Sequence, residues 1–190
     1  MKNINKLLFT TFLLILSFAK AQETKVNSTE SKLTVYGTSN IHDWDVVAEN
    51  MSGTAVFETE NGILKTIKSM RFSVVSESLK SGKSGMDKNT YKALKTEKHQ
   101  NIVFVVTNIS KVTANANETY TVATQGNLTI CGITKKINQT FTIKNLGNKF
   151  TISGKQKIDM TTYGIEPPKA LMGTIKTGKE VTIDFTIIYK

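Results

Sequence analysis

The chain has few of the residues that catalytic and metal sites most often use. It holds one cysteine, Cys131, and two histidines, His42 and His99. A single cysteine excludes an internal disulfide. No local residue supplies a base for a catalytic thiol, so we expect a small buried side chain. A zinc site needs further Cys, His or carboxylate ligands, and neither histidine belongs to a pair with ligand spacing. We therefore expect no metal and no cofactor.

Arginine is also nearly absent. Arg71 is the only one, although the formal net charge is +10. Surfaces that bind phosphates specifically use arginine heavily, and the lysines here are scattered through the chain rather than clustered. We expect no nucleic-acid partner and a solvated, lysine-rich surface. A peripheral contact with an anionic membrane surface stays open.

Only one long apolar run occurs, and it lies near the N-terminus. The run over 7–18 follows two lysines and is too short to span a bilayer as a helix. Ala21 completes a small-x-small pattern that is typical of signal-peptide cleavage. We expect residues 1–21 to be a signal peptide, with an uncleaved anchor as the alternative. The protein would then be periplasmic or secreted.

Most of the remaining chain alternates apolar and polar residues, with the period of half-buried strands. Turn signals such as Asn61-Gly62 and Cys131-Gly132 separate these segments, and the short connections are typical of antiparallel neighbours. Near 51–53 the alternation changes parity, which predicts a bulge. Eight strands are expected, over 32–37, 44–59, 67–79, 102–113, 120–131, 135–146, 150–160 and 180–190.

One segment departs from this period. Residues 86–104 read MDKNTYKALKTEKHQNIVF, and the first half of this segment has helical spacing. The face of the expected helix consists of Met86, Thr90, Tyr91 and Leu94. Ser84 or Asp87 is expected to cap its first turn. The sequence therefore predicts one short helix in an otherwise all-β chain.

Eight antiparallel strands usually close into a barrel, because closure removes exposed edges. An eight-stranded barrel is wide enough to be filled by side chains or to hold one small ligand. Five apolar residues on the predicted inner faces are the expected ligand contacts: Phe72, Phe104, Phe141, Ile183 and Phe185. The alternative is that these side chains simply fill the interior.

Several segments resemble the YceI-like family of exported lipid-binding proteins. They are the helical segment above, 126–137 (GNLTICGITKKI), 158–168 (IDMTTYGIEPP), 173–185 (GTIKTGKEVTIDF) and 37–44 (GTSNIHDW). Their order and spacing extend the resemblance over nearly all of 31–190. The sequence departs from the family at Gln100 or Asn101, where the family often has proline.

The resemblance implies an all-β fold, a lipocalin-like antiparallel eight-stranded barrel with one short side helix. It also implies a long apolar cavity that binds a polyisoprenoid or similar lipid tail, so the expected partner is an isoprenoid or fatty lipid. It carries no catalytic motif. The expected domains are a signal peptide over 1–21, a flexible leader over 22–31 and a YceI-like lipid-binding barrel over 32–190. The oligomeric state stays open.

Two loops are candidates for the mouth of this cavity. Leu171 and Met172 follow a rigid proline pair, and they either cover the barrel end or contact the lipid. His42 and Trp44 stand at the start of a strand. We expect Trp44 to anchor the barrel end, and His42 to make a structural hydrogen bond or to contact a ligand headgroup.

Two other interpretations remain. The first is a small exported hydrolase that uses the cluster between Ser39 and Asp45, which includes His42. A catalytic triad needs its base placed in space between the nucleophile and the orienting acid, and adjacency at a strand start does not provide that. The second is a structural or interaction protein with a filled barrel.

Overall fold

The computed structural model describes residues 19–190. Its strands are β1 (Ala19–Lys25), β2 (Lys32–Ser39), β3 (Trp44–Ala48), β4 (Met51–Glu60), β5 (Ile63–Val75), β6 (Leu79–Lys80), β7 (Asn101–Ala114), β8 (Thr119–Ile130), β9 (Ile133–Asn145), β10 (Phe150–Asp159), β11 (Lys169–Ala170) and β12 (Ile175–Tyr189). One α-helix is described, α1 (Ser84–Leu94), together with 3-10 turns at Ser76–Ser78, Met160–Tyr163 and Leu171–Gly173.

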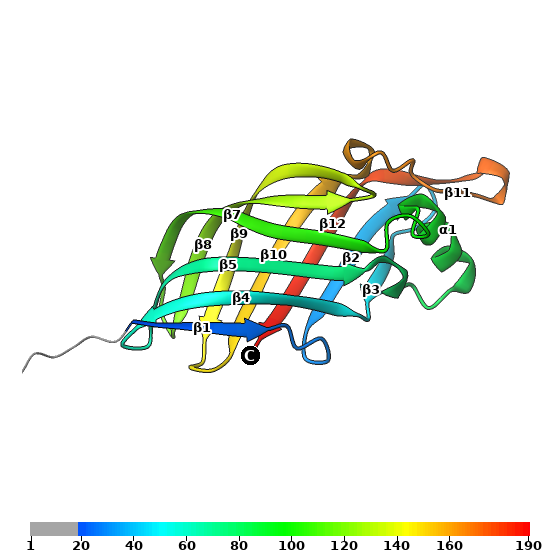
Figure 1. The fold of residues 1–190 in the computed structure, drawn as a ribbon. Helices are drawn as coiled ribbons and strands as arrows, with labels where there is room; N and C mark the ends of the chain where they lie inside the picture. The colour runs from blue at the N-terminus through cyan, green and yellow to red at the C-terminus, as the bar shows by residue number, and fades with distance from the viewer. Residues whose placement is uncertain (1–18) are drawn as a thin grey trace, which may run out of the picture.

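The strands form one antiparallel sheet that curls around an interior (Figure 1). Its order is β1-β4-β5-β7-β8-β9-β10-β12-β2-β3-β6. β3 leads directly into β4, and β6 follows β5 after one 3-10 turn. The pairing of β3 with β6 therefore brings the last two strands of this order back beside the β4–β5 hairpin, to which both are joined along the chain. If β3 is counted with β4 and β5 with β6, this order holds nine strands, which are the eight expected ones and β1. The predicted lipocalin-like barrel class is confirmed.

The expected strand over 44–59 is divided into β3 and β4, and the division lies before the bulge that was predicted near 51–53. The parity of buried residues changes from Val46 and Ala48 on β3 to Met51 on β4. The change occurs at Glu49 and Asn50, whose backbone groups bond to the Ser76–Ser78 region: the Glu49 N–H donates to Ser78 O at 3.0 Å, and Asn50 O accepts from Val75 N–H at 3.1 Å. The break lets β3 and β4 face different partners, so the predicted position at 51–53 was wrong by about two residues.

Two predicted turns close tight hairpins. The central residues have positive φ at Asn61-Gly62 (52° and 78°) and at Cys131-Gly132 (49° and 76°). Two positive φ values in succession match the type I′ turn, whose twist suits paired strands. Cys131 is buried, and its thiol donates to Leu94 O at 3.1 Å. Burial raises the pKa of this thiol. The β8–β9 turn is thereby attached to the end of α1.

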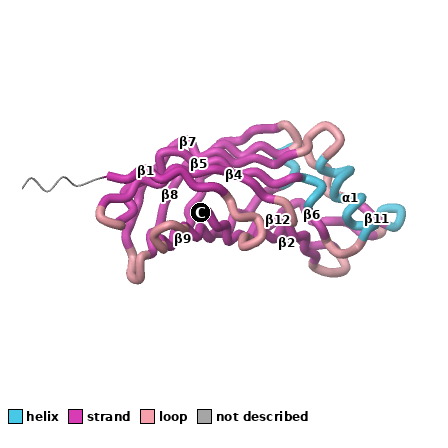
Figure 2. The backbone as a smooth tube through the Cα atoms, turned by 60° about the horizontal axis from the view of Figure 1, so that its bottom comes forward, coloured by secondary structure: helices cyan, strands magenta, loops and turns pink. Residues whose placement is uncertain are grey.

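The predicted helix is present, but its cap differs. Neither Ser84 nor Asp87 caps α1, because no side chain bonds to its first turn. The Asp87 carboxylate accepts hydrogen bonds from the Ser81 backbone N–H (2.8 Å) and hydroxyl (2.6 Å), which fixes the preceding loop. α1 lies at one end of the barrel, near β6 and β11 (Figure 2). Among residues 19–190, no helix has the length and hydropathy to cross a membrane.

Residues 1–18 of the expected signal peptide lie outside the described residues. Cleavage of the signal peptide stays a prediction. The expected flexible leader over 22–31 differs in the structure, because its first residues belong to β1, which pairs with β4. Thr24 is buried and donates to Ala55 O at 3.1 Å. The Asn27 N–H donates to Ile188 O at 2.8 Å. Backbone groups on the β4 edge gain partners from β1 in this way.

One end of the barrel interior is filled. The rings of Phe57 and Phe150 stack with centroids 3.9 Å apart, and Tyr189 meets Phe57 edge-on at 5.9 Å. All three side chains are fully buried. The Tyr189 hydroxyl donates to Arg71 O at 3.3 Å, and burial raises the pKa of this phenol. This end is therefore a packed core, stabilised further by aromatic contacts of about 0.5–1.5 kcal/mol each.

Candidate functional site

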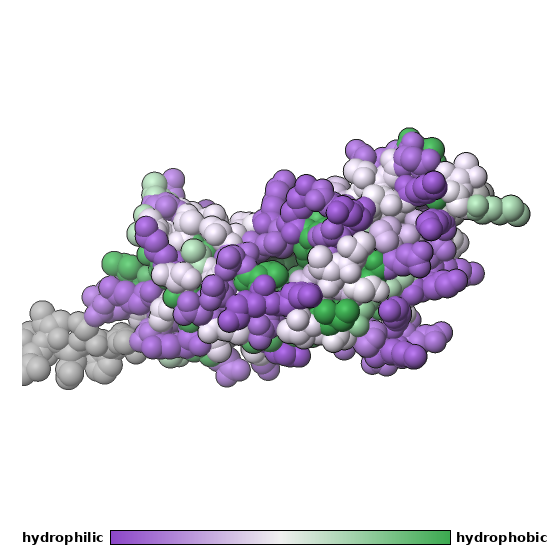
Figure 3. All heavy atoms as spheres, turned by 90° about the horizontal axis from the view of Figure 1, so that it is seen from above, coloured by the Kyte–Doolittle hydropathy of each residue, from purple (hydrophilic) through white to green (hydrophobic). Residues whose placement is uncertain are grey.

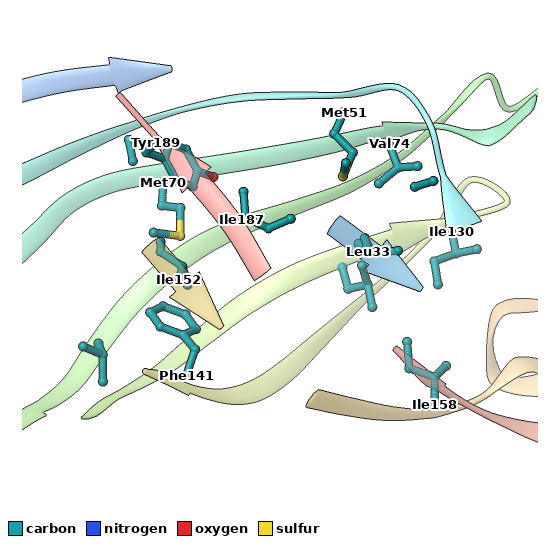
Figure 4. Close-up of a cluster of buried hydrophobic side chains, with 14 of the residues drawn as sticks. Leu33, Met51, Met70, Val74, Ile130, Phe141, Ile152, Ile158, Ile187 and Tyr189 are labelled. Carbon is teal, nitrogen blue, oxygen red and sulfur yellow. The ribbon is translucent and has the colours of Figure 1, made fainter. Parts of the chain in front are cut away.

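The other half of the interior holds a cavity of about 200 Å³. Side chains from strands around the barrel line it, and Thr90, Ala93 and Leu94 of α1 line its outer end. Its inner end lies against the packed core: Figure 4 shows Phe141 and Ile152 grouped with Tyr189. The cavity therefore ends blindly at the aromatic core and extends toward α1.

The wall of this cavity carries no charged residue among those described. Its polar groups are few, and most are already bonded within the protein. The Trp44 indole N–H donates to Thr38 O at 2.9 Å, and the Thr90 hydroxyl donates to Met86 O at 3.1 Å. A charged guest buried here would lose its hydration without compensation. The wall therefore suits an apolar guest.

The cavity is reached from the surface on one face of the molecule. Figure 3 shows hydrophobic side chains in a hollow between rows of hydrophilic ones. Ile183 and Phe185 line the cavity and are only partly buried, although both lie on the inner face of β12. The apolar interior is therefore open to a ligand rather than sealed.

Glycines keep this interior open. Phe104 lies against Gly126, and Phe185 lies against Gly154, each on a neighbouring strand. A Cβ at Gly126 would be 2.4 Å from the Phe104 ring, and one at Gly154 would be 2.9 Å from the Phe185 ring. The rings can lie along the barrel wall only because these glycines have no side chain. With a side chain there, they would be pushed into the cavity.

Most of the predicted contact residues line the cavity: Phe72, Phe104, Phe141, Ile183, Phe185 and Trp44. Trp44 lies over Gly37, its partner on β2, where a Cβ would be 2.1 Å from the indole ring. The structure thus brings together residues from distant parts of the chain. That they contact a ligand stays a prediction.

Of the remaining three candidates, His42 and Met172 do not line the cavity. His42 is exposed, and its Nδ1 lies 2.8 Å from Asp43 O, so it belongs to a turn outside the cavity. Met172 is fully exposed with φ of 56°. The side chain of Leu171 lies outside what the structure describes. Ile165 and Pro168, from the preceding loop, are on the cavity wall instead.

The cluster from Ser39 to Asp45 forms a turn. The Ser39 hydroxyl donates to His42 O at 2.7 Å and accepts from the His42 backbone N–H at 3.1 Å. Neither contact involves the imidazole, so the nucleophile–base pair of a hydrolase is not formed. Within residues 19–190, no three His, Cys, Asp or Glu side chains come close enough to hold a metal ion.

The sequence interpretation missed two polar residues of the wall, Gln139 on β9 and Gln156 on β10. A usable signal was present. Gln139 has the same parity as Phe141 and Ile143, which are buried on the inner face of β9. Strand parity therefore places it inside, although its polarity argues for the surface.

Residues 17–189 match the family model of the YceI-like domain. The chain belongs to the YceI-like family. The resemblance stated from the sequence motifs is thereby confirmed, and the YceI-like region includes β1 as well as the barrel. Comparison with curated protein sequences gives no match.

Solved structures share the YceI-like fold at low sequence identity. BcnA of Burkholderia cenocepacia is 17% identical, with a TM-score of 0.68 over 86% of this chain and 98% of its own. A domain of Saccharophagus degradans, described as polyisoprenoid binding and implicated in plant cell wall breakdown, is 13% identical with a TM-score of 0.69, over 90% and 99%. The YCEI protein of Campylobacter jejuni is 15% identical with a TM-score of 0.56, over 74% and 81%.

Proposed function

We propose that this YceI-like protein is an exported binding protein that holds the tail of a polyisoprenoid or similar lipid and performs no chemistry on it. The observation that carries the proposal is the blind, uncharged cavity between the aromatic core and α1. The polyisoprenoid-binding description of the Saccharophagus degradans domain supports the same class of ligand. The turn geometry at Ser39 gives the hydrolase alternative no support.

The cavity volume limits the length of tail that can be buried. A group of water or methylene size takes up about 30 Å³, so about 200 Å³ has room for roughly seven such groups. A longer tail would extend beyond the cavity. Because each buried methylene contributes about 0.8 kcal/mol, affinity should rise about fourfold per methylene until this length is reached.

Export of the protein belongs to the same proposal. It rests on the apolar run over 7–18 and the cleavage pattern ending at Ala21. Cleavage there would leave Gln22–Lys25 to pair with β4. In a Gram-negative host, the protein should be recovered from the periplasm with Gln22 at its N-terminus. Intact Met1 protein in the cytosol would contradict export without touching the binding proposal.

The binding proposal is tested by native mass spectrometry and a chain-length series. Protein purified from producing cells should carry a lipid mass, and the emptied protein should bind linear alcohols of about 4 to about 14 carbons. Affinity should rise with length and level off at about seven carbons, as the cavity volume requires. A protein that carries no lipid and binds none of these alcohols would overturn the proposal.

A further inference from the structure

The barrel wall has a gap in its backbone pairing between β9 and β10. The two strands pair from Phe150 with Asn145 to Ser153 with Thr142, and the pairing stops there. β9 stays paired with β8 as far as Ile133, and β10 stays paired with β12 as far as Asp159. We call the unpaired stretch, 133–141 of β9 and 154–159 of β10, the seam.

Gln139 bridges the seam. Its side chain is 5% exposed, and its amide nitrogen donates to Thr140 O at 2.7 Å and to Lys155 O at 3.3 Å. These two carbonyls, one from each strand, fix the nitrogen at the seam, so the amide oxygen must point away from them. No described residue donates a hydrogen bond to this oxygen. It is an acceptor without a described partner, on a residue of the cavity wall.

Gln156 lies on the other strand, and its side chain bonds only within that strand. Its amide nitrogen donates to Lys157 O at 3.0 Å, and no described residue donates to its oxygen. Both glutamines line the cavity. The seam therefore places two hydrogen-bond acceptors on a wall that is otherwise apolar. An amide oxygen without a protein partner can accept a hydrogen bond from a guest, so a guest with a donor at this position would be favoured.

The lysines beside the seam already have partners. Lys155 pairs with Asp184 at 2.9 Å, and Lys157 pairs with Glu180 at 2.7 Å, both across the outer face of β10 and β12. An anionic group at the seam would meet amide oxygens and neutralised lysines. Lys135 lies on the same face of β9 as Gln139, but four residues of strand place it about 13 Å away.

We propose that the seam holds the polar end of the bound lipid and selects a hydroxyl group there. The ligand class is an alcohol with one apolar tail: the tail fills the cavity and the hydroxyl donates to Gln139 or Gln156. A hydrocarbon has no donor for these oxygens, and an ionised phosphate ester has only acceptors. This inference rests on the proposed function, which supplies the tail.

Three probes that share the same apolar tail and differ at its end test the inference: farnesol, farnesyl phosphate and the hydrocarbon farnesene. Their affinities are measured by displacement of N-phenyl-1-naphthylamine from the emptied protein. Farnesol should bind about five- to tenfold more tightly than farnesene, the range expected for one net hydrogen bond. It should also bind more tightly than farnesyl phosphate, because the wall offers the phosphate no cation.

Substitutions test whether the preference for farnesol over farnesene comes from the seam. Gln139→Met removes one of the two acceptors at similar volume and should reduce the preference for farnesol over farnesene. The double variant Gln139→Met/Gln156→Met should bring the two affinities together. Gln125→Met, a matched change on β8 outside the cavity wall, should leave the preference intact. Thermal unfolding checks the fold of each variant. If Gln139→Met does not fold, because two carbonyls lose their donor, Gln156→Met should still reduce the preference.

The outcomes separate the two proposals. If wild-type protein binds none of the three probes, the proposed function fails. If it binds all three equally, or binds farnesyl phosphate most tightly, the tail site stands and the hydroxyl selection at the seam is wrong. A preference for farnesol that survives in the folded double variant Gln139→Met/Gln156→Met would also overturn the assignment to the seam.

Discussion

The ring of Phe185 on β12 lies over Gly154, its register partner on β10. A Cβ built on Gly154 would be 2.9 Å from Cζ of that ring and 3.3 Å from Cβ of Phe141. Both aromatic residues line the cavity. The space for a lipid tail therefore depends on a residue that contributes no side chain of its own.

Gly154→Ala should reduce lipid binding and stability together. The added methyl must displace Phe185 toward the cavity, and overpacking of this kind costs about 1–3 kcal/mol. Urea unfolding and displacement of a fluorescent apolar probe measure the two effects. Gly85→Ala is the matched control, because a Cβ there has no neighbour within 4 Å. Equal probe affinity in wild type and Gly154→Ala would contradict the role given to this glycine.

Leu94→Asp should destabilise the fold by several kcal/mol. Leu94 is buried at the end of α1 and lines the cavity, so the substitution buries an unpaired carboxylate. Lys88→Asp places the same residue on the exposed side of α1 and should change stability by less than about 0.5 kcal/mol. Chemical denaturation compares them. If Leu94→Asp melts like wild type, α1 does not pack against the barrel as described.

Acid should weaken the filled end of the barrel through Glu30. Hydrogen bonds from Lys149 (2.6 Å) and Lys190 (2.5 Å) lower the pKa of Glu30 from 4.5 to about 2. Since the folded pKa lies below the unfolded one, the contribution is full above about pH 4.5 and is lost as pH falls toward 2. Glu30→Gln should therefore flatten the pH dependence of Tm in this window. An unchanged slope would mean that Glu30 contributes nothing.

The elements with strong local signals were predictable from the sequence. On β8, Tyr120, Val122, Leu128 and Ile130 alternate with less buried residues along the whole strand. The helix was expected because its spacing differs from everything around it. Family motifs then supplied the barrel class and the apolar cavity. Local periodicity and turn chemistry were sufficient at each of these places.

The features that were not predicted from the sequence depend on partners distant along the chain. The β1 segment has no apolar alternation, and it is a strand because the β4 edge offers it backbone partners. The seam arises where the pairing of β9 with β10 ends, which no local pattern encodes. Asp87 holds Ser81 rather than capping α1, because the loop before the helix folds back onto it. Gln139 is the exception, because its parity with Phe141 and Ile143 on β9 already placed it inside.

The central claim is that the cavity holds a lipid tail, and Ile183→Trp tests it most directly. Ile183 lines the cavity and is only partly buried, so the larger side chain has space to occupy. Thr182→Trp adds the same ring to the opposite face of β12, outside the cavity wall. Both variants and the wild type are compared by thermal unfolding and by titration with a fluorescent fatty probe.

We expect both variants to stay folded, with Ile183→Trp losing at least about tenfold in probe affinity, the equivalent of two buried methylenes. Thr182→Trp should bind as wild type does. A folded Ile183→Trp that binds the probe as tightly as wild type would contradict a lipid tail in this cavity. Unfolding of Ile183→Trp, with no probe bound by wild type, would favour a filled barrel.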